Sequence, residues 1–475
     1  MLARGQARLV KEQHYKVTLQ SLCKNINESL PIPKKSEFLK LEEKFQALKE
    51  LLLRDRFNSY QEKYCSFLKA FRALLQSPEY KQAILLEYDQ RLQPCLKQIH
   101  ELTYAFFAKI DLQDFSRQLI VEILGPIERQ EFKEIRSLFL KLHKVLKTNL
   151  VSWKEKDFLY YLFYVKDQIN FGFDPFFQGN VPFFFFSTHY RKQDQKRRVI
   201  NMRLACPSIE DFTSIIFRQA AISPEFMGLL AAYRSMNKKH LYINLQERKA
   251  KLLWKNEAAR CFALEQIMQD SPREFIFVGL AKNSPFYWQE EPFEHLNEAK
   301  AFKKKLFDEL MKGDRFFWPS FLSQDECFCV DIEHLIDKIH ESFFSSSDLL
   351  SKAERLDFIE IFYAYLIERL IDYTGVDSYN ITCKDGIDRG VSMSALLYLL
   401  QVLRSDNPQI DIEDFVAFVF VPAMLGRLRE IKDTRLERML SAFTRLLNLK
   451  QQNISLELFD DGFSIAAISR TPVME

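Results

Sequence analysis

A strand-like segment, a tight loop and an apolar segment of helical length follow one another near the carboxyl-terminal end of this chain. Tyr379 to Thr382 is the expected strand and Val391 to Leu403 the expected helix. Between them stands the sequence Cys-Lys-Asp-Gly-Ile-Asp-Arg, residues 383–389, which we call the cysteine loop. The pattern predicts a strand, loop, helix unit, in which the loop is fixed at both ends.

The composition indicates a globular protein. With 475 residues, 47% of them hydrophobic, the chain can bury a large core and is expected to form two or three domains. A formal net charge of +3 is too small to indicate nucleic-acid binding. The eight cysteines predict neither a disulfide framework nor a zinc site, and no metal or cofactor is expected.

The first part of the chain, residues 1–170, is predicted to be a helical domain with no catalytic signature. Apolar residues recur at helical spacing among lysines and glutamates. The expected helices are 36–52, 60–75, 80–92, 130–147 and 153–168. Its charged start, 1–16, resembles neither a secretory signal nor a membrane anchor, and no apolar run is long enough to span a bilayer.

Glycines and prolines cluster after Phe171, where we expect a domain boundary. Strands are then predicted at 240–245, 275–280 and 328–332, separated by helices at 256–269 and 298–311. Residues 412–451 are again helical. The predicted fold class is therefore α+β, a mixed α/β arrangement in which residues 171–475 form a central sheet flanked by helices.

The residue types in the cysteine loop suit the hydrolysis of phosphate monoesters. A thiolate at Cys383 would attack phosphorus and form a phosphocysteine, which water then hydrolyses. Backbone N–H groups, a helix N-terminus and one arginine favour the thiolate and bind the phosphate. Arg389 would hold two phosphate oxygens in a fork, and Gly386 would let the backbone approach the anion.

The leaving alkoxide needs a proton, for which Asp388 is the preferred candidate and Asp385 the alternative. Lys384 adds a positive charge that favours a substrate with several phosphates. Lys384, Asp385, Gly386 and Ile387 together are the expected substrate-binding residues. Asp385 as a turn cap and Lys384 as a solvated charge are the simpler alternatives.

The cysteine loop resembles that of the cysteine-based phosphatases with a C-x5-R motif. Myotubularins carry C-S-D-G-W-D-R, which matches at Cys383, Asp385, Gly386, Asp388 and Arg389. Inositol polyphosphate 4-phosphatases and bacterial effectors of the SopB and IpgD type carry C-K-S-G-K-D-R, which shares Lys384 but has lysine at Ile387. An aspartate before the arginine is common to both groups, so the resemblance implies a phosphoinositide or inositol phosphate substrate.

The resemblance to the effector group further implies a bacterial protein that is delivered into a host cell and meets anionic membranes there. The chain departs from the common pattern at Gly390, where a threonine or serine usually follows the arginine. A hydroxyl from Thr382 or Ser392 is the expected substitute. Two other functions stay open: a protein tyrosine or dual-specificity phosphatase, and a catalytically degenerate module that binds lipids or acts as a scaffold.

Two further motifs have simple interpretations. Phe183 to Phe186, followed by basic residues between Arg191 and Arg198, predicts a buried strand before a solvated loop, with an interfacial membrane contact as the alternative. Trp318-Pro319-Ser320 resembles the acid loop of tyrosine phosphatases but lacks its aspartate, and Asp325 is a remote substitute. The histidines show no metal-ligand spacing.

Overall fold

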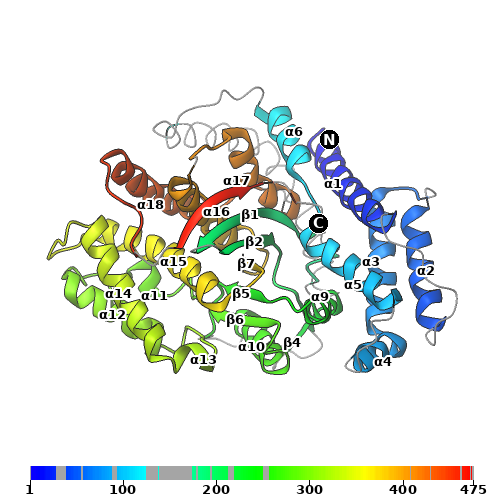
Figure 1. The fold of residues 1–475 in the computed structure, drawn as a ribbon. Coiled ribbons are helices and arrows are strands. Elements are labelled where there is room, and N and C mark those ends of the chain that lie inside the picture. Colours follow the sequence, from blue (N-terminus) through cyan, green and yellow to red (C-terminus); the bar gives the residue numbers. More distant parts are fainter. Residues whose placement is uncertain are drawn as a thin grey trace.

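A computed structural model gives the fold (Figure 1). It describes residues 2–27, 39–54, 57–87, 94–124, 137, 174–177, 180–192, 195–211, 219–249, 256–406, 408–427, 429–459, 463–470 and 472.

The described helices precede, separate and follow the strands of the central sheet. The first group is α1 (Leu2–Asn27), α2 (Leu39–Leu53), α3 (Tyr60–Gln76), α4 (Pro78–Glu87), α5 (Pro94–Ala108) and α6 (Gln113–Leu124). The second is α9 (Pro224–Ser235), α10 (Asn256–Asp270), α11 (Pro285–Trp288), α12 (Ala299–Lys312), α13 (Ser320–Ser323), α14 (Glu326–Phe343) and α15 (Lys352–Thr374). The last is α16 (Asp388–Arg404), α17 (Ile412–Arg427) and α18 (Asp433–Gln451).

The central sheet has six strands in the order β6-β5-β7-β2-β1-β8. Its strands are β1 (Phe183–Lys192), β2 (Gln195–Arg203), β5 (His240–Asn244), β6 (Phe275–Gly279), β7 (Ser378–Thr382) and β8 (Phe463–Ser469). β2, β7, β5 and β6 run parallel, whereas β1 is antiparallel to both of its neighbours. A separate hairpin joins β3 (Ser208–Asp211) to β4 (Gln219–Ile222). The predicted α+β fold is confirmed.

The order of the parallel strands places a topological switch point, where open α/β sheets form a crevice, at the carboxyl ends of β5 and β7. The chain moves from β5 outward to β6, and then back across β5 to β7. Because such crossovers are right-handed, α10 and α15 lie on opposite faces of the sheet. α16 packs against α15 and β7, so the helices that follow β5 and β7 diverge. Ligands bind at such a switch point in open α/β sheets.

Most expected elements of the described residues are confirmed, including the helix 60–75 and the strands at 240–245, 275–280 and 379–382. The strand predicted at 328–332 is wrong, because this segment lies inside α14. Phe328, Ile332 and Ile336 are buried at helical spacing, and the Asp325 carboxylate caps the helix by accepting from the backbone N–H groups of Cys327 and Phe328. The helices expected at 130–147 and 153–168 lie outside the described residues.

Phe183 to Phe186 are all buried in β1, which confirms the buried strand. The phenylalanine side chains on both faces of β1 are covered, because helices pack against each face. This burial excludes the interfacial membrane contact for these four residues. Among the described residues, no helix is long and apolar enough to cross a membrane.

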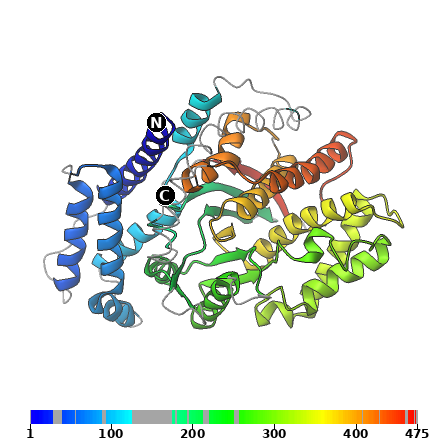
Figure 2. The same cartoon turned by 180° about the vertical axis from the view of Figure 1, so that it is seen from behind.

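The N-terminal helices pack directly on the sheet region. Figure 2 shows α1 to α5 in blue at one end of the molecule, with α5 reaching the sheet. Arg72 of α3 bonds the Glu225 carboxylate of α9 at 2.7 Å, and the Phe107 ring of α5 lies 6.1 Å from the Phe226 ring of α9. The boundary expected near Phe171 lies outside the described residues. The division into 1–170 and 171–475 therefore stays a prediction.

The Phe107 ring provides a test of this contact. Phe107 is 0% exposed and packs edge-on against Phe176 and Phe226. We expect Phe107→Ala to lower the free energy of unfolding by about 3–5 kcal/mol, because removing a buried ring leaves a cavity. Leu85→Ala is the control, since Leu85 is 69% exposed. Urea unfolding followed by circular dichroism measures both, and equal midpoints for the two variants would contradict the packing.

Candidate active site

The cysteine loop connects the end of β7 to the start of α16, as the sequence predicts. Cys383 directly follows β7 and Arg389 lies in the first turn of α16. Gly386 makes the turn with a φ of 59°, and a Cβ on it would lie 2.3 Å from the backbone oxygen of Leu204. Only glycine fits this left-handed and crowded position.

A buried guanidinium supports the back of the loop. Arg203, at the end of β2, is 4% exposed and donates to the backbone oxygens of Asp385 at 2.5 Å and Gly386 at 3.3 Å. It also bonds the side-chain oxygen of Asn180 at 3.0 Å. Burial lowers the pKa of Arg203 to about 10, and attraction to Asp385 and Cys383 counters part of that effect. Arg203 is therefore a cation at neutral pH.

The orientation of these carbonyls fixes the orientation of the loop's N–H groups. The backbone oxygen of Lys384 accepts from Cys206 N at 2.9 Å, in line with the carbonyls that face Arg203. In a trans peptide the C=O and the next N–H point in opposite directions. The N–H groups of Asp385 and Ile387 are therefore directed away from this support, as an anion-binding loop requires.

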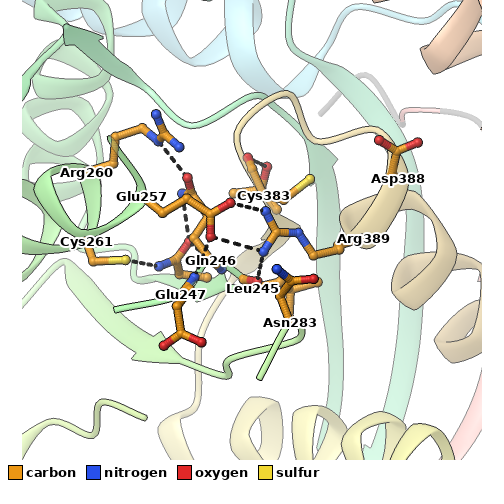
Figure 3. Close-up of polar contacts among 12 residues, drawn as sticks. Leu245, Gln246, Glu247, Glu257, Arg260, Cys261, Asn283, Cys383, Asp388 and Arg389 are labelled. Carbon is orange, nitrogen blue, oxygen red and sulfur yellow. Dashed lines mark hydrogen bonds and ion pairs between the residues drawn. The ribbon is translucent and has the colours of Figure 1, made fainter. Parts of the chain in front are cut away.

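Arg389 lies beside Cys383 and is held by two groups from the β5 side of the crevice. Its Nη1 donates to the Leu245 backbone oxygen at 2.8 Å, and its Nη2 lies 2.6 Å from the Glu257 carboxylate (Figure 3). Burial alone would lower its pKa, but attraction to Cys383 and Glu257 and the hydrogen bonds that it donates to them raise the pKa above the ordinary value. Arg389 stays charged.

The contacts of Arg389 leave donors for a ligand. A guanidinium has five N–H bonds, and three contacts go to Leu245 and Glu257. The remaining N–H groups include the one that bonds Cys383. A phosphate at Cys383 can take over this donor without breaking the ion pair to Glu257. Cys383 itself is 6% exposed.

Glu257 was not expected from the sequence. It lies in the first turn of α10, on the far side of the crevice, and also accepts from the backbone N–H of Glu247 at 2.7 Å. Burial would raise its pKa, but Arg389 and the other hydrogen bonds lower it overall, so Glu257 is ionised. The one sequence feature that could have indicated Glu257 is its position as an acidic residue at the start of a predicted helix that follows a predicted strand. No sequence feature indicated Arg203, because nothing in the sequence relates it to a loop so distant in the chain.

Asp388 does not face the sulfur. Its carboxylate accepts two bonds from Arg429, at 2.8 and 2.7 Å, and one from the backbone N–H of Lys432 at 3.1 Å. Figure 3 shows it turned away from Cys383 and Arg389. Burial would raise the pKa of Asp388, but these bonds lower it below the ordinary value. The geometry holds Asp388 as an ion and so does not favour the predicted acid role.

The remaining loop residues take different positions. The Asp385 carboxylate forms an ion pair with Arg427 of α17 and accepts from Asn180 at 3.4 Å. The Ile387 side chain is 1% exposed and packs near Gly426, so only its backbone can reach a substrate. Lys384 is partly buried at the loop's start.

Packing explains the glycine that follows Arg389. A Cβ on Gly390 would lie 2.7 Å from the backbone oxygen of Ile381 and 3.2 Å from Cα of Thr382. The start of α16 therefore lies too close to β7 for a threonine or serine. The expected substitute hydroxyls are engaged elsewhere: Thr382 donates to the Leu204 oxygen at 2.6 Å, and Ser392 donates to the Arg389 oxygen at 3.2 Å.

The other expected candidates have structural roles. Trp318 Nε1 donates to the Leu310 oxygen at 2.8 Å and anchors the segment that resembles an acid loop. Asp325 caps α14. His240 bonds Ser378 and Asn380 through its two ring nitrogens, and burial lowers its pKa to about 4.

Comparison with protein-family models, curated proteins and solved structures found no match to this chain. The assignment of the site therefore depends on its own geometry and on the resemblance of the cysteine loop.

Adding a side chain at Gly390 tests the packing argument. We expect Gly390→Ser and Gly390→Ala to destabilise the fold by similar amounts, about 1–3 kcal/mol, because either Cβ meets the β7 backbone. Gly228→Ala is the matched control, since its Cβ would meet only side-chain methyl groups, those of Leu75 at 3.1 Å and of Thr103 at 3.4 Å. Thermal unfolding compares the three. A serine variant as stable as the wild type would contradict the close approach of α16 to β7.

The ion pair of Asp388 predicts a pH-dependent contribution to stability. Its folded-state pKa is lowered, so the contribution is present above the ordinary value of 3.8 and is lost as the pH falls through the folded-state pKa. We expect Asp388→Asn to be less stable than the wild type at pH 7 and the difference to disappear in acid. Unfolding measured from pH 7 down to pH 2 tests this, because the scan has to extend below the folded-state pKa. A difference that is constant over this range would contradict the pairing with Arg429.

Proposed function

We propose that this protein is a cysteine-dependent phosphatase that acts on phosphoinositides or inositol phosphates. The observation that carries the proposal is the pairing of Cys383 with Arg389 at the switch point of a parallel sheet, on a loop whose Asp385 and Ile387 N–H groups face away from its own support. The positive end of α16 adds to the attraction for a phosphate.

In the proposed reaction the Cys383 thiolate forms a bond to phosphorus as the bond from phosphorus to the substrate oxygen breaks. The electron pair of that bond leaves with the alkoxide, which takes up a proton. Water then attacks the phosphocysteine, phosphate is released and the thiolate returns. Arg389 and the N–H groups of Asp385 and Ile387 would stabilise the charge on the transferred group. Arg203 and Arg389 would both attract the thiolate.

The leaving alkoxide requires a proton donor. Asp388 is the acid that the sequence predicts, and acting as one requires it to release Arg429 and take up a proton when substrate binds. In the structure it instead joins the start of α16 to the segment before α18. Asp385 is bound by Arg427 in a similar way.

A test of Asp388 compares leaving groups. If Asp388 is the acid, Asp388→Asn should lose at least about tenfold in kcat on an inositol phosphate, whose alkoxide needs the proton. It should keep most of its activity on p-nitrophenyl phosphate, whose phenolate leaves unprotonated. Equal losses on both substrates would assign Asp388 a structural role, and Arg429→Met should then show the same losses.

The cations around the loop favour a substrate with several phosphates. Lys384 stands on the loop, and Arg435 of α18 bonds Asn283, which lies beside Arg389 in Figure 3. The Arg435 guanidinium lies over the Tyr287 and Trp288 rings. Its positive charge would favour a second ring phosphate, which a phosphotyrosine lacks. Delivery to a host cell and action at its membranes rest on the loop's resemblance to the effector group alone.

Phosphate release from a panel of substrates tests the proposal. The panel contains phosphoinositides in vesicles, soluble inositol phosphates and phosphotyrosine peptides. We expect release from the inositol compounds, its loss in Cys383→Ser and a decrease of at least about 100-fold in Arg389→Lys, which cannot form the fork. Cys206→Ser is the matched control, because Cys206 is a buried cysteine behind the loop. Release from peptides alone would instead indicate a protein phosphatase.

The ion pair between Glu257 and Arg389 supports one other function. Glu257 already occupies part of the Arg389 guanidinium fork. Fewer donors then remain to stabilise a transferred phosphoryl group, which suits a module that binds phosphate without cleaving it. No release from any substrate, together with retained binding of inositol phosphates, would favour this lipid-binding or scaffold role.

A further inference from the structure

A cavity of about 770 Å³ lies at the edge of the sheet opposite the cysteine loop. Its walls come from the end of α1, from α5, from β2 and from the turn before β5. Asp377, which precedes β7, lines it, whereas Cys383 follows β7. Six residues of extended chain separate the two, roughly 20 Å at about 3.3 Å per residue. The cavity is therefore separate from the candidate active site.

The cavity is strongly cationic. Two carboxylates line it, those of Glu101 and Asp377, against six basic side chains: Lys97, Lys109, Lys196, Arg197, Arg198 and Lys238. The Asp377 carboxylate accepts a hydrogen bond of 2.8 Å from the backbone N–H of Lys239. So many cations around one space attract a ligand with several negative charges.

A buried, uncharged histidine belongs to the same wall. Ser235 Oγ donates to the Ala232 oxygen at 3.0 Å, so the contact of 2.9 Å between His100 Nδ1 and Ser235 Oγ uses a hydrogen from the histidine. Burial lowers the pKa of His100 to about 4, so the ring is neutral and Nε2 carries no hydrogen. Nε2 is buried without a hydrogen-bond partner, and His100 lines the cavity.

We propose that this cavity binds a small molecule that carries several phosphates, such as a polyphosphorylated inositol. The phosphates would contact the lysines and arginines. The volume lies in the range of small-molecule sites, about 300–1,000 Å³. Because α5 and β2 both line the cavity, the ligand would join the N-terminal helices to the sheet.

The position of the cavity favours a soluble ligand over a membrane surface. A bilayer bound at this edge would leave the cysteine loop on the far side of the sheet, away from the lipid. The ligand would instead act at a distance from the loop. This inference does not depend on the proposed phosphatase activity.

Calorimetric titration of the full chain with inositol 1,3,4,5-tetrakisphosphate tests the proposal. Cys383→Ser protein is used so that no ligand is hydrolysed. We expect Lys97→Ala/Lys196→Ala, added to this protein, to weaken binding at least tenfold, because it removes two exposed cations of the wall. Lys312→Ala/Lys352→Ala is the matched control with the same loss of charge elsewhere, and it should bind as before. Hydrogen exchange should show protection in α5 and β2.

Three outcomes would overturn the proposal. The first is the absence of binding, and the second is equal weakening by the two double variants. The third is protection confined to residues 383–389, which would place the ligand in the candidate active site. A parallel titration uses phosphatidylcholine vesicles with and without phosphatidylinositol bisphosphate. Binding to these vesicles that needs Lys97 and Lys196, without binding of the soluble compound, would assign the cavity to a membrane surface.

Discussion

The candidate site depends on one buried cation behind the cysteine loop. Arg203 donates to the backbone oxygens of Asp385 and Gly386 in the loop, and to Val181 and Asn180 outside it. A buried charge is costly unless its donors are satisfied. The loop backbone supplies two of the four acceptors, so a change in the loop's conformation would leave part of the guanidinium unsatisfied. The same bonds turn the N–H groups toward the side where a phosphate would bind.

The sheet brings the other half of the site to this loop. β5 and β7 are neighbours, and the helices that follow them leave on opposite faces, so Glu257 and Arg389 meet across the crevice between them. The ion pair fixes the guanidinium before a ligand arrives. Positioning a charged group in advance is a large part of what such a site contributes to catalysis.

The local sequence was sufficient to predict the strand, loop and helix around Cys383, because these segments are neighbours in the chain. It predicted Cys383 and Arg389 together, and the structure places them side by side. It could not predict Glu257 or Arg203, which reach the loop only through strand order. The orientation of Asp388 depends on Arg429 in the same way. The strand predicted at 328–332 was wrong for a different reason. A short apolar run is compatible with the spacing of a strand and with that of a helix, and the Asp325 cap stabilises the helix here.

The central claim is that Cys383 carries the phosphoryl group during turnover, and one measurement tests it directly. The protein is quenched in acid while it hydrolyses an inositol phosphate, then digested and analysed by mass spectrometry. We expect the peptide that contains Cys383 to carry one phosphoryl group, and Cys383→Ser protein to show no such adduct. Phosphate release without this adduct, or an adduct on another residue, would contradict the account.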